Sequence, residues 1–285
     1  MKKILKVDVK EEALSLFSEV TYKNEAYWYG EAERPLKLSI IVPKHKETHK
    51  KLPLFVWLCG GAFQVVDRNV WLPEFIPIAR EGFIVASVEY RTTNDVPFPA
   101  YLTDAKAAIR YLRAHAEQYC IDVKNVFIGG ESAGGLLAAQ VGVFADKSEY
   151  DVGDFLDQSS AVNGVIDFYG PVTDAQLEFT KKNNFMLYLA ELQRIGGMPE
   201  EKADVLKASS VLHSISSKTP PFLIFHGTAD EKVSIKESEE LYSVLTDHHV
   251  DCDLIELEGA MHGADEFFQP EIRKYMMEFM RKNMK

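Results

Sequence analysis

The chain has 285 residues, 46% of them hydrophobic, which is enough to bury one large core. We therefore treat residues 1–285 as a single domain. A formal net charge of −11 disfavours nucleic acid or an anionic membrane surface as the main partner. The cysteines, Cys59, Cys120 and Cys252, have unrelated spacings, which indicates free thiols in a reducing compartment and no metal site.

The N-terminal stretch predicts a cytoplasmic protein. Lys2 and Lys3 are followed by Asp8, Glu11 and Glu12 rather than by a long apolar run, so no signal peptide is expected. The sequence also has no stretch of about 18 consecutive apolar residues, and we expect neither a transmembrane helix nor a membrane partner.

Segments with the composition of β-strands recur along the chain. They are residues 36–42, 53–59, 83–90, 125–130, 162–170, 221–227 and 250–259. Several, such as PLFVWLC at residues 53–59, are continuous apolar runs, which are typical of strands buried on both faces of a sheet. The charged residues 44–51 predict a surface turn between two early strands.

Helical patterns lie between these strands. Apolar residues at positions 102, 105, 109, 112 and 116 fall on one helix face, and further helices are predicted near residues 136–145, 235–245 and 268–279. Alternating strands and helices indicate an α/β fold with a mostly parallel central sheet and helices on both faces. The last helix has a broad apolar face, which either packs only on the sheet or also carries a homodimer contact.

Residues 174–217 interrupt this alternation. They contain no clear strand and include the helical segment FMLYLAELQRIGG, at residues 185–197. The segment is too long for a plain connection. We interpret it as a small cap or lid insertion over one end of the sheet; the alternative is a core helix with long loops.

The pentapeptide Gly130-Glu131-Ser132-Ala133-Gly134 has the pattern G-x-S-x-G between a predicted strand and a predicted helix. Such a sharp turn strains the serine backbone, requires small neighbours, and raises the hydroxyl above the carboxyl edge of the sheet beside a helix N-terminus. A phosphate-binding loop is the alternative, but no Gly-Lys-Ser/Thr follows. Ser132 is therefore the candidate nucleophile.

A serine nucleophile needs a base and an acid, which in this arrangement follow in the order Ser, Asp or Glu, His. Of the eight histidines, His262 lies between the last strand and the last helix, with glycines on both sides. Asp230 follows the preceding strand and is the candidate acid, with Glu231 as the alternative. Either carboxylate could instead belong to a solvated turn or cap the next helix.

Hydrolysis also needs N–H donors for an oxyanion. The backbone of Ala133, directly after the serine, is one candidate, and the paired glycines Gly60 and Gly61 after the strand at residues 53–59 are the others. Phe63, Gln64 and Tyr169 are candidates for contacts with substrate, although side chains of these types lie more often in a core. The chemistry requires no metal and no cofactor.

The segments PLFVWLCGGAF, VASVEYR, FPAYLTDAKAAIRYLR, VFIGGESAGG, DFYGP, PPFLIFHGTADEKV and GAMHG occur in this order from about residue 36 to the C-terminus. Together they resemble the α/β-hydrolase superfamily, specifically hormone-sensitive-lipase-like esterases and bacterial feruloyl and acetyl-xylan esterases. The resemblance implies Ser132, Asp230 and His262 as a catalytic triad, and Gly60, Gly61 and Ala133 as the oxyanion hole.

One position departs from the family pattern. The oxyanion loop of that family usually begins H-G-G-G, whereas here Cys59 replaces the histidine and Ala62 the third glycine. Backbone donors survive this change, but the hydrogen bonds by which a histidine would brace the loop are lost.

These features predict a serine carboxylesterase that acts on short-chain acyl esters. The resemblance implies acetyl or hydroxycinnamoyl esters on carbohydrate fragments, so the expected partner is a small-molecule or oligosaccharide ester. The alternatives are an amide hydrolase of the same fold, such as a formamidase or small peptidase, and a non-enzymatic binding protein of this fold.

Overall fold

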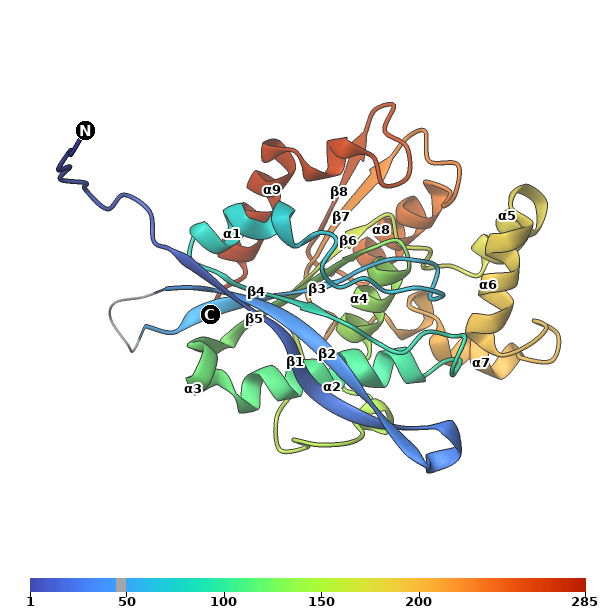
Figure 1. Ribbon diagram of the computed structural model, residues 1–285. Helices are drawn as coiled ribbons and strands as arrows, with labels where there is room; N and C mark the ends of the chain where they lie inside the picture. Colours follow the sequence, from blue (N-terminus) through green and yellow to red (C-terminus); the bar gives the residue numbers. More distant parts are fainter. Residues whose placement is uncertain (45–49) are drawn as a thin grey trace.

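The computed structural model describes residues 1–44 and 50–285, so residues 45–49 of the predicted surface turn lie outside the described part. Its centre is an eight-stranded sheet in the order β1-β2-β4-β3-β5-β6-β7-β8 (Figure 1). The first two pairings, β1 with β2 and β2 with β4, are antiparallel, and all others are parallel. The strands are β1 (Leu14–Tyr27), β2 (Ala32–Pro43), β3 (Leu52–Leu58), β4 (Ile84–Val88), β5 (Ile121–Glu131), β6 (Gly164–Phe168), β7 (Phe222–Gly227) and β8 (Cys252–Leu257).

Helices cover both faces of this sheet. The α-helices are α1 (Ile76–Arg80), α2 (Ala100–Ala114), α3 (Ala116–Tyr119), α4 (Ala133–Val143), α5 (Ala175–Asn183), α6 (Phe185–Ile195), α7 (Ala203–Ser209), α8 (Lys236–Asp247) and α9 (Pro270–Lys282). Short 3₁₀ turns occur at η1 (Trp28–Gly30), η2 (Leu72–Phe75), η3 (Ser148–Tyr150), η4 (Leu212–Ser214) and η5 (Asp265–Phe268). The predicted mostly parallel α/β fold is confirmed.

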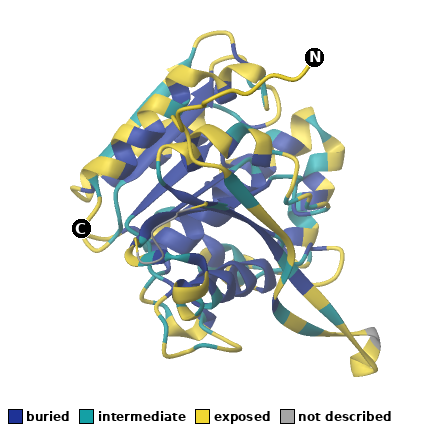
Figure 2. Cartoon of the chain, turned by 60° about the vertical axis from the view of Figure 1, so that its left-hand side comes forward, coloured by how far each residue is buried: buried dark blue, intermediate teal, exposed yellow. Residues whose placement is uncertain are grey.

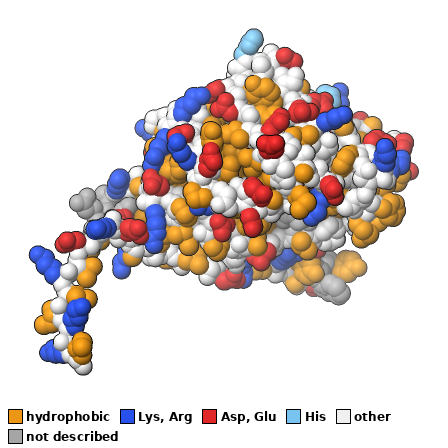
Figure 3. Space-filling model, turned by 90° about the horizontal axis from the view of Figure 1, so that it is seen from above, with side chains coloured by type: hydrophobic (Ala, Val, Ile, Leu, Met, Phe, Trp, Pro, Cys, Tyr) orange, Lys and Arg blue, Asp and Glu red, His pale blue; other side chains and the backbone are white. Residues whose placement is uncertain are grey.

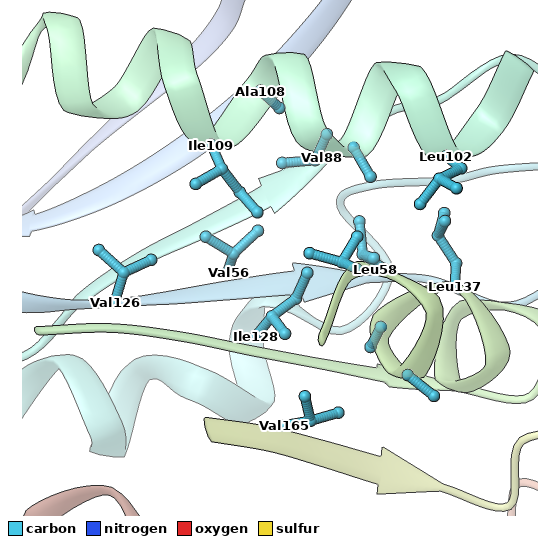
Figure 4. Packing of buried hydrophobic residues seen from close by; sticks show 14 of the residues in the cluster. Val56, Leu58, Val88, Leu102, Ala108, Ile109, Val126, Ile128, Leu137 and Val165 are labelled. Carbon is cyan, nitrogen blue, oxygen red and sulfur yellow. The ribbon is translucent and has the colours of Figure 1, made fainter. Parts of the chain in front are cut away.

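The core is divided by the sheet into two clusters. On one face, α2, α4 and α8 bury residues such as Ile109, Leu137 and Leu241 against the strands. Figure 4 shows Ile109 of α2 directed at the side chain of Val56, and Leu137 of α4 directed at Leu102 of α2. On the other face, α1 and α9 bury a second cluster. Two buried layers hold the parallel strands rigid, and the ends of those strands carry the candidate site.

All seven predicted strands are present, and β3 is buried along its whole length, as its apolar composition predicts. The sequence did not indicate β1. This edge strand pairs only with β2, and most of its side chains are exposed, so it lacks the clean alternation that marks a half-buried strand. Figure 2 shows the β1–β2 hairpin extending from the body, with exposed residues along it.

The C-terminal helix α9 uses its apolar face against the sheet. Met276, Phe279 and Met280 are buried in the second core cluster, whereas Tyr275 is exposed. A homodimer contact therefore stays a prediction.

Residues 1–13 precede β1 as an exposed arm, and Figure 3 shows the lysine and hydrophobic side chains of this arm projecting from the body. Across residues 1–44 and 50–285, no helix has both the length and the apolar character needed to cross a bilayer.

Residues 174–217 form three α-helices, α5, α6 and α7, and the 3₁₀ turn η4, and they contain no strand. The helix predicted from FMLYLAELQRIGG is α6, which begins after the capping residue Asn184 and ends at Gly196. Figure 1 shows the three helices standing together at one side of the sheet.

Candidate active site

Ser132 occupies a strained turn between β5 and α4. Its φ of 55° and ψ of −122° lie outside the regions that a residue with a side chain prefers. A Cβ at Gly134 would approach the Leu58 carbonyl oxygen to 2.0 Å, and one at Gly130 would approach the Gly134 carbonyl oxygen to 2.2 Å. Only glycine fits at these two positions, which accounts for the small residues that flank the serine.

The turn is also held from the side. The backbone N–H of Ser132 donates to the carbonyl oxygen of Phe168, at the end of β6, over 2.9 Å. This bond helps to fix the serine at the carboxyl edge of the sheet, beside the loops that follow β7 and β8.

Those two loops bring the predicted partners to the serine. The Nε2 of His262 lies 3.0 Å from Ser132 Oγ, and its Nδ1 lies 2.7 Å from Asp230 Oδ2. A carboxylate oxygen only accepts, so Nδ1 carries the proton and Nε2 is left to accept from the serine hydroxyl. Asp230, rather than the exposed Glu231, makes this contact.

Asp230 is buried and well supplied with donors. Its Oδ1 accepts from the backbone N–H groups of Lys232, at 2.8 Å, and Val233, at 3.0 Å. Burial raises the pKa of this carboxyl, but the hydrogen bond and charge of His262 and the two amides outweigh it, so the pKa lies below its usual value. Asp230 is therefore ionised at neutral pH.

His226, in β7, contacts the loop that carries Asp230. Its ring is fully buried, with Nε2 3.1 Å from the Val233 carbonyl oxygen and Nδ1 2.7 Å from Ser238 Oγ. The carbonyl only accepts, so Nε2 donates to it and Nδ1 accepts from the hydroxyl. Burial lowers the pKa of His226, more than the nearby Asp230 charge raises it, which keeps the ring neutral.

The loop after β3, where the sequence predicts oxyanion donors, differs from expectation at Gly60. Its N–H donates to the carboxylate of Glu131, which also accepts from Trp71 Nε1 at 3.3 Å. Burial raises the pKa of Glu131, although both hydrogen bonds act to lower it. The Gly60 donor is thus already engaged, whereas Gly61 and Ala133 line the cleft beside Ser132.

Ala133 is the first residue of α4, and the first N–H groups of a helix have no carbonyl partner within it. Ala62, in the position of the third glycine of the family pattern, also lines the cleft and has a φ of 53°. The loop after β3 and the start of α4 therefore border one space.

Cys59 is braced by other groups in place of the missing histidine contacts. The Tyr90 hydroxyl donates to the Cys59 carbonyl oxygen over 2.5 Å, and the Glu131 carboxylate holds the next residue. Burial raises the pKa of the Cys59 thiol to about 12, so it stays protonated.

Two of the three predicted substrate contacts are buried side chains that do not line the cleft. Phe63 is 1% exposed, and its ring packs 4.3 Å from that of Tyr101 in the core. Tyr169 is fully buried, with its ring 4.6 Å from the His262 ring, where it walls the imidazole. Both residues have positive φ, which their sequence context does not reveal.

The third predicted contact, Gln64, lies outside the cleft. Its Nε2 donates to Thr93 Oγ1 over 2.8 Å, and it lines a separate groove beside α6, with Met186 and Leu189.

The cleft over Ser132 has a volume of about 270 Å³. Its walls also contain Pro171, the α5 residues Gln176 and Thr180, the α6 residues Leu187 and Glu191, and Lys232. Sequence reasoning singled out none of these six as site residues. The spacing of four residues within each helix was a usable signal of one shared face, but it did not identify what that face borders. In the described part of the chain, no cluster of three or more His, Cys, Asp or Glu could hold a metal ion.

Comparison with known proteins places this site in a family. The family model described as BD-FAE matches residues 38–245, about three quarters of the chain. The chain belongs to the BD-FAE family. The matched range includes Ser132 and Asp230 but ends before His262.

Curated relatives of this BD-FAE member are esterases. Esterase LipC of Mycobacterium tuberculosis (strain ATCC 25618 / H37Rv) is 24% identical over 218 residues, 76% of this chain and 54% of LipC. Esterase LipQ of the same organism is 26% identical over 244 residues, 83% of this chain and 56% of LipQ. The chain thus spans about half the length of the curated relatives it matches.

Solved structures confirm the α/β-hydrolase fold of this BD-FAE chain. A truncated carbohydrate esterase from gut microbiota has a TM-score of 0.82 and 26% identity, and the alignment covers 98% of this chain and 99% of that one. A bifunctional GH43-CE protein of Bacteroides eggerthii has a TM-score of 0.81 and 25% identity, covering 94% of this chain and 35% of that one.

Proposed function

We propose that the protein is a serine carboxylesterase that hydrolyses short-chain acyl esters. The observation that carries this proposal is the unbroken chain of hydrogen bonds from Ser132 Oγ through His262 to Asp230, at 3.0 and 2.7 Å. A serine hydroxyl becomes nucleophilic when a neutral imidazole stands ready to accept its proton and a buried carboxylate orients that imidazole.

In the proposed mechanism, Ser132 Oγ attacks the ester carbonyl carbon while its proton moves to His262 Nε2. Asp230 holds the imidazole and stabilises the imidazolium that forms. The negative charge on the former carbonyl oxygen is met by the N–H groups of Gly61 and Ala133. The C–O bond to the alcohol breaks as the alcohol oxygen takes the proton from Nε2, which leaves an acyl-serine.

Water completes the cycle by the same route. It attacks the acyl carbon while Nε2 accepts one of its protons, and that proton returns to Ser132 Oγ as the carboxylic acid leaves.

We propose acetyl esters on carbohydrate fragments as the substrates. A cleft of about 270 Å³ suits a short acyl group better than a hydroxycinnamoyl group. The neighbouring structure titled a carbohydrate esterase, 26% identical over nearly the whole chain, supports a sugar as the alcohol. In this proposal residues 174–217 act as a cap, because Gln176, Thr180, Leu187 and Glu191 wall the cleft.

The deciding experiment is Ser132→Ala assayed on p-nitrophenyl acetate. We expect kcat/KM to fall by at least about 10³-fold. The exposed Ser148 provides a control, since Ser148→Ala should leave turnover unchanged. Retention of most activity in Ser132→Ala would refute the assignment.

Labelling with a fluorophosphonate separates an enzyme from a binding protein of the same fold, because only an activated Ser132 forms the covalent adduct. Comparison of p-nitrophenyl acetate with p-nitroacetanilide tests the bond that is cleaved. Faster turnover of the anilide would favour an amide hydrolase over an esterase.

A further inference from the structure

The exposed arm before β1 contains a segment with the pattern of a strand. In KILKVDVKE, at residues 3–11, positions 5, 7 and 9 are apolar and positions 6, 8 and 10 are charged. This alternation is typical of a strand that buries one face. In the part of the chain that the structure describes, no strand pairs with the segment, and Leu5, Val7 and Val9 are between 65% and 77% exposed. The apolar face is thus left open.

The base of the arm is fixed to the body. Glu11 Oε2 lies 2.7 Å from Arg80 Nη1 of α1, and the Lys44 N–H donates to the Ala13 carbonyl oxygen over 2.7 Å. Beyond these contacts the arm projects away from the body (Figure 3). Its strand-like part therefore stands where a second chain can reach it.

We propose that the arms of two copies of this chain pair as antiparallel strands about a two-fold axis at Val7. Such an interface is isologous, so every pair except the one on the axis occurs twice. The residues that face one another are Lys3 and Glu11, Ile4 and Lys10, Leu5 and Val9, Lys6 and Asp8, and Val7 with the partner's Val7.

This register sorts the side chains by face. Successive side chains of a strand point to opposite faces, so the odd positions of both arms share one face. That face carries the three apolar side chains of each arm, bounded at both ends by a Lys3–Glu11 pair. The other face carries the Lys6–Asp8 pairs. Opposite charges and apolar groups that face each other across two strands stabilise the pairing.

Other antiparallel registers bring unfavourable pairs together. A slip of one residue places Val7 opposite Lys6 or Asp8, which exposes apolar side chains to charged ones. A slip of two residues places Asp8 opposite the partner's Asp8, or Lys6 opposite the partner's Lys6, and like charges that face each other are destabilising. The charge pattern of the arm therefore complements itself in one register.

The base of the arm also borders a hollow that can receive the second arm. Its volume is about 1290 Å³, and it is lined by charged residues and by apolar ones that include Val9, Leu14, Pro77 and Ala79. Because the partner's Leu5 lies opposite Val9 in the proposed register, its side chain comes beside these walls. Two strands alone are only marginally stable in water, so a surface for the apolar face to pack against supports the pairing.

The first test exchanges charges within the arm and measures the monomer–dimer equilibrium by analytical ultracentrifugation. The wild type should be mostly dimeric at about 100 µM. Lys6→Asp places a carboxylate opposite Asp8 at two places, and it should raise the dissociation constant at least about ten-fold. The double variant Lys6→Asp/Asp8→Lys restores opposite charges with an unchanged composition, and it should return the dissociation constant to within about three-fold of the wild type.

Two controls accompany the charge exchange. Lys218→Asp makes the same change of net charge at an exposed position outside the arm, and it should leave the equilibrium unchanged. Thermal unfolding should also be unchanged in every variant. Figure 1 shows the arm on the opposite side of the sheet from α5 and α6, so these variants leave the cleft intact. The inference is thus independent of the proposed function, and an inactive wild type would bear only on the latter.

The second test locates the axis by cross-linking. Val7→Cys brings the two introduced thiols face to face, so mild oxidation should give a disulfide-linked dimer on a non-reducing gel. Lys10→Cys is the matched control, because its two thiols lie six residues apart along the paired strands, about 20 Å, and cannot be joined. The wild type, with its partly exposed Cys120 and Cys252, gives the background.

Several outcomes would overturn the inference. One is a wild type that stays monomeric at about 100 µM. Another is a dimer that Lys6→Asp leaves intact, since a different surface, such as that of α9, would then hold it together. Failure of the double variant to recover, or equal cross-linking at positions 7 and 10, would show that the arms do not pair in this register.

Discussion

The carboxyl edge of the sheet and the wall formed by α5 and α6 border the same cleft but are built differently. At the sheet edge, Ser132 sits between glycines packed against backbone, and its N–H is bonded to the end of β6. The wall instead belongs to a three-helix segment whose helix α6 exposes Phe185 and Met186. The contrast indicates that the core fixes the position of Ser132, whereas the opposite wall belongs to a helical segment that is partly exposed.

The largest effect should come from the sheet edge. Asp230→Asn keeps the size of the side chain that contacts His262 but removes the charge that, in the proposed mechanism, stabilises the imidazolium. We expect kcat to fall by roughly 10³–10⁴-fold, measured on p-nitrophenyl acetate. Glu231→Gln, one residue away and exposed, should keep nearly full activity. Equal losses in the two variants would contradict the assignment of the acid.

The next effect concerns stability in the two regions. Ile128 of β5 is fully buried, and Ile128→Ala should lower the free energy of unfolding by about 2–5 kcal/mol. Met186 of α6 is 73% exposed, and Met186→Ala should change it by less than about 0.5 kcal/mol. Urea unfolding gives both values, and similar losses would show that α6 is as firmly packed as the sheet.

A third effect depends on pH, through a contact that joins α8 to Thr173, shortly before α5. Glu237 of α8 is buried and accepts from the N–H and hydroxyl of Thr173, and burial raises its pKa to about 8. An unfolded glutamic acid ionises near pH 4.5. Between these values the folded state keeps a proton that the unfolded state has released, so stability falls as pH rises.

We expect this group to contribute a decline of up to roughly 1.4 kcal/mol per pH unit between pH 5 and 7.5. Glu237→Gln removes the titration, and its unfolding free energy should fall less steeply over that range. Burial also raises the pKa of Asp167 to about 7, so Asp167 lowers stability as pH rises in the wild type and in Glu237→Gln alike. Identical pH slopes for wild type and variant would contradict the prediction.

The smallest effect concerns the hydrogen bond between Gly60, in the loop after β3, and Glu131. Glu131→Ala removes the acceptor of the Gly60 N–H, so we expect kcat to fall about ten-fold through a less well-placed loop. Glu131→Gln retains an amide oxygen at that place and should lose less. Steady-state kinetics on p-nitrophenyl acetate separates the two, and equal losses would assign the effect to charge rather than to the hydrogen bond.

The sequence predicted the parts of the molecule that local patterns determine. Seven strands were recognisable from their composition. Ser132, Asp230 and His262 follow three of these strands, and because the three strands are parallel, the residues meet at one edge of the sheet. The engagement of Gly60 was not predictable in this way. The Gly60 N–H is bonded to the carboxylate of Glu131, 71 residues further along the chain. In the G-x-S-x-G pattern Glu131 is a position that any residue may occupy, so the pattern gave no reason to expect this bond.

Other features depended on tertiary structure alone. Left-handed backbone at Phe63 and Tyr169 turns aromatic residues into the core, although both lie next to candidate site residues. The strand β1 is mostly exposed, so its sequence shows little of the alternation between apolar and polar residues that marks a half-buried strand. The polar wall of the cleft depends on how α5 and α6 dock, which the helix patterns leave open.

The β1–β2 hairpin offers a practical route for engineering. Its turn, Trp28–Gly30, projects from the body, and an added Cβ at Gly30 would meet no atom within 4 Å (Figure 2). Exposed turns of this kind accept inserted sequence with little loss of folding. A carbohydrate-binding module or an affinity handle placed in this turn would tether the protein to a surface while leaving both chain ends and the cleft untouched.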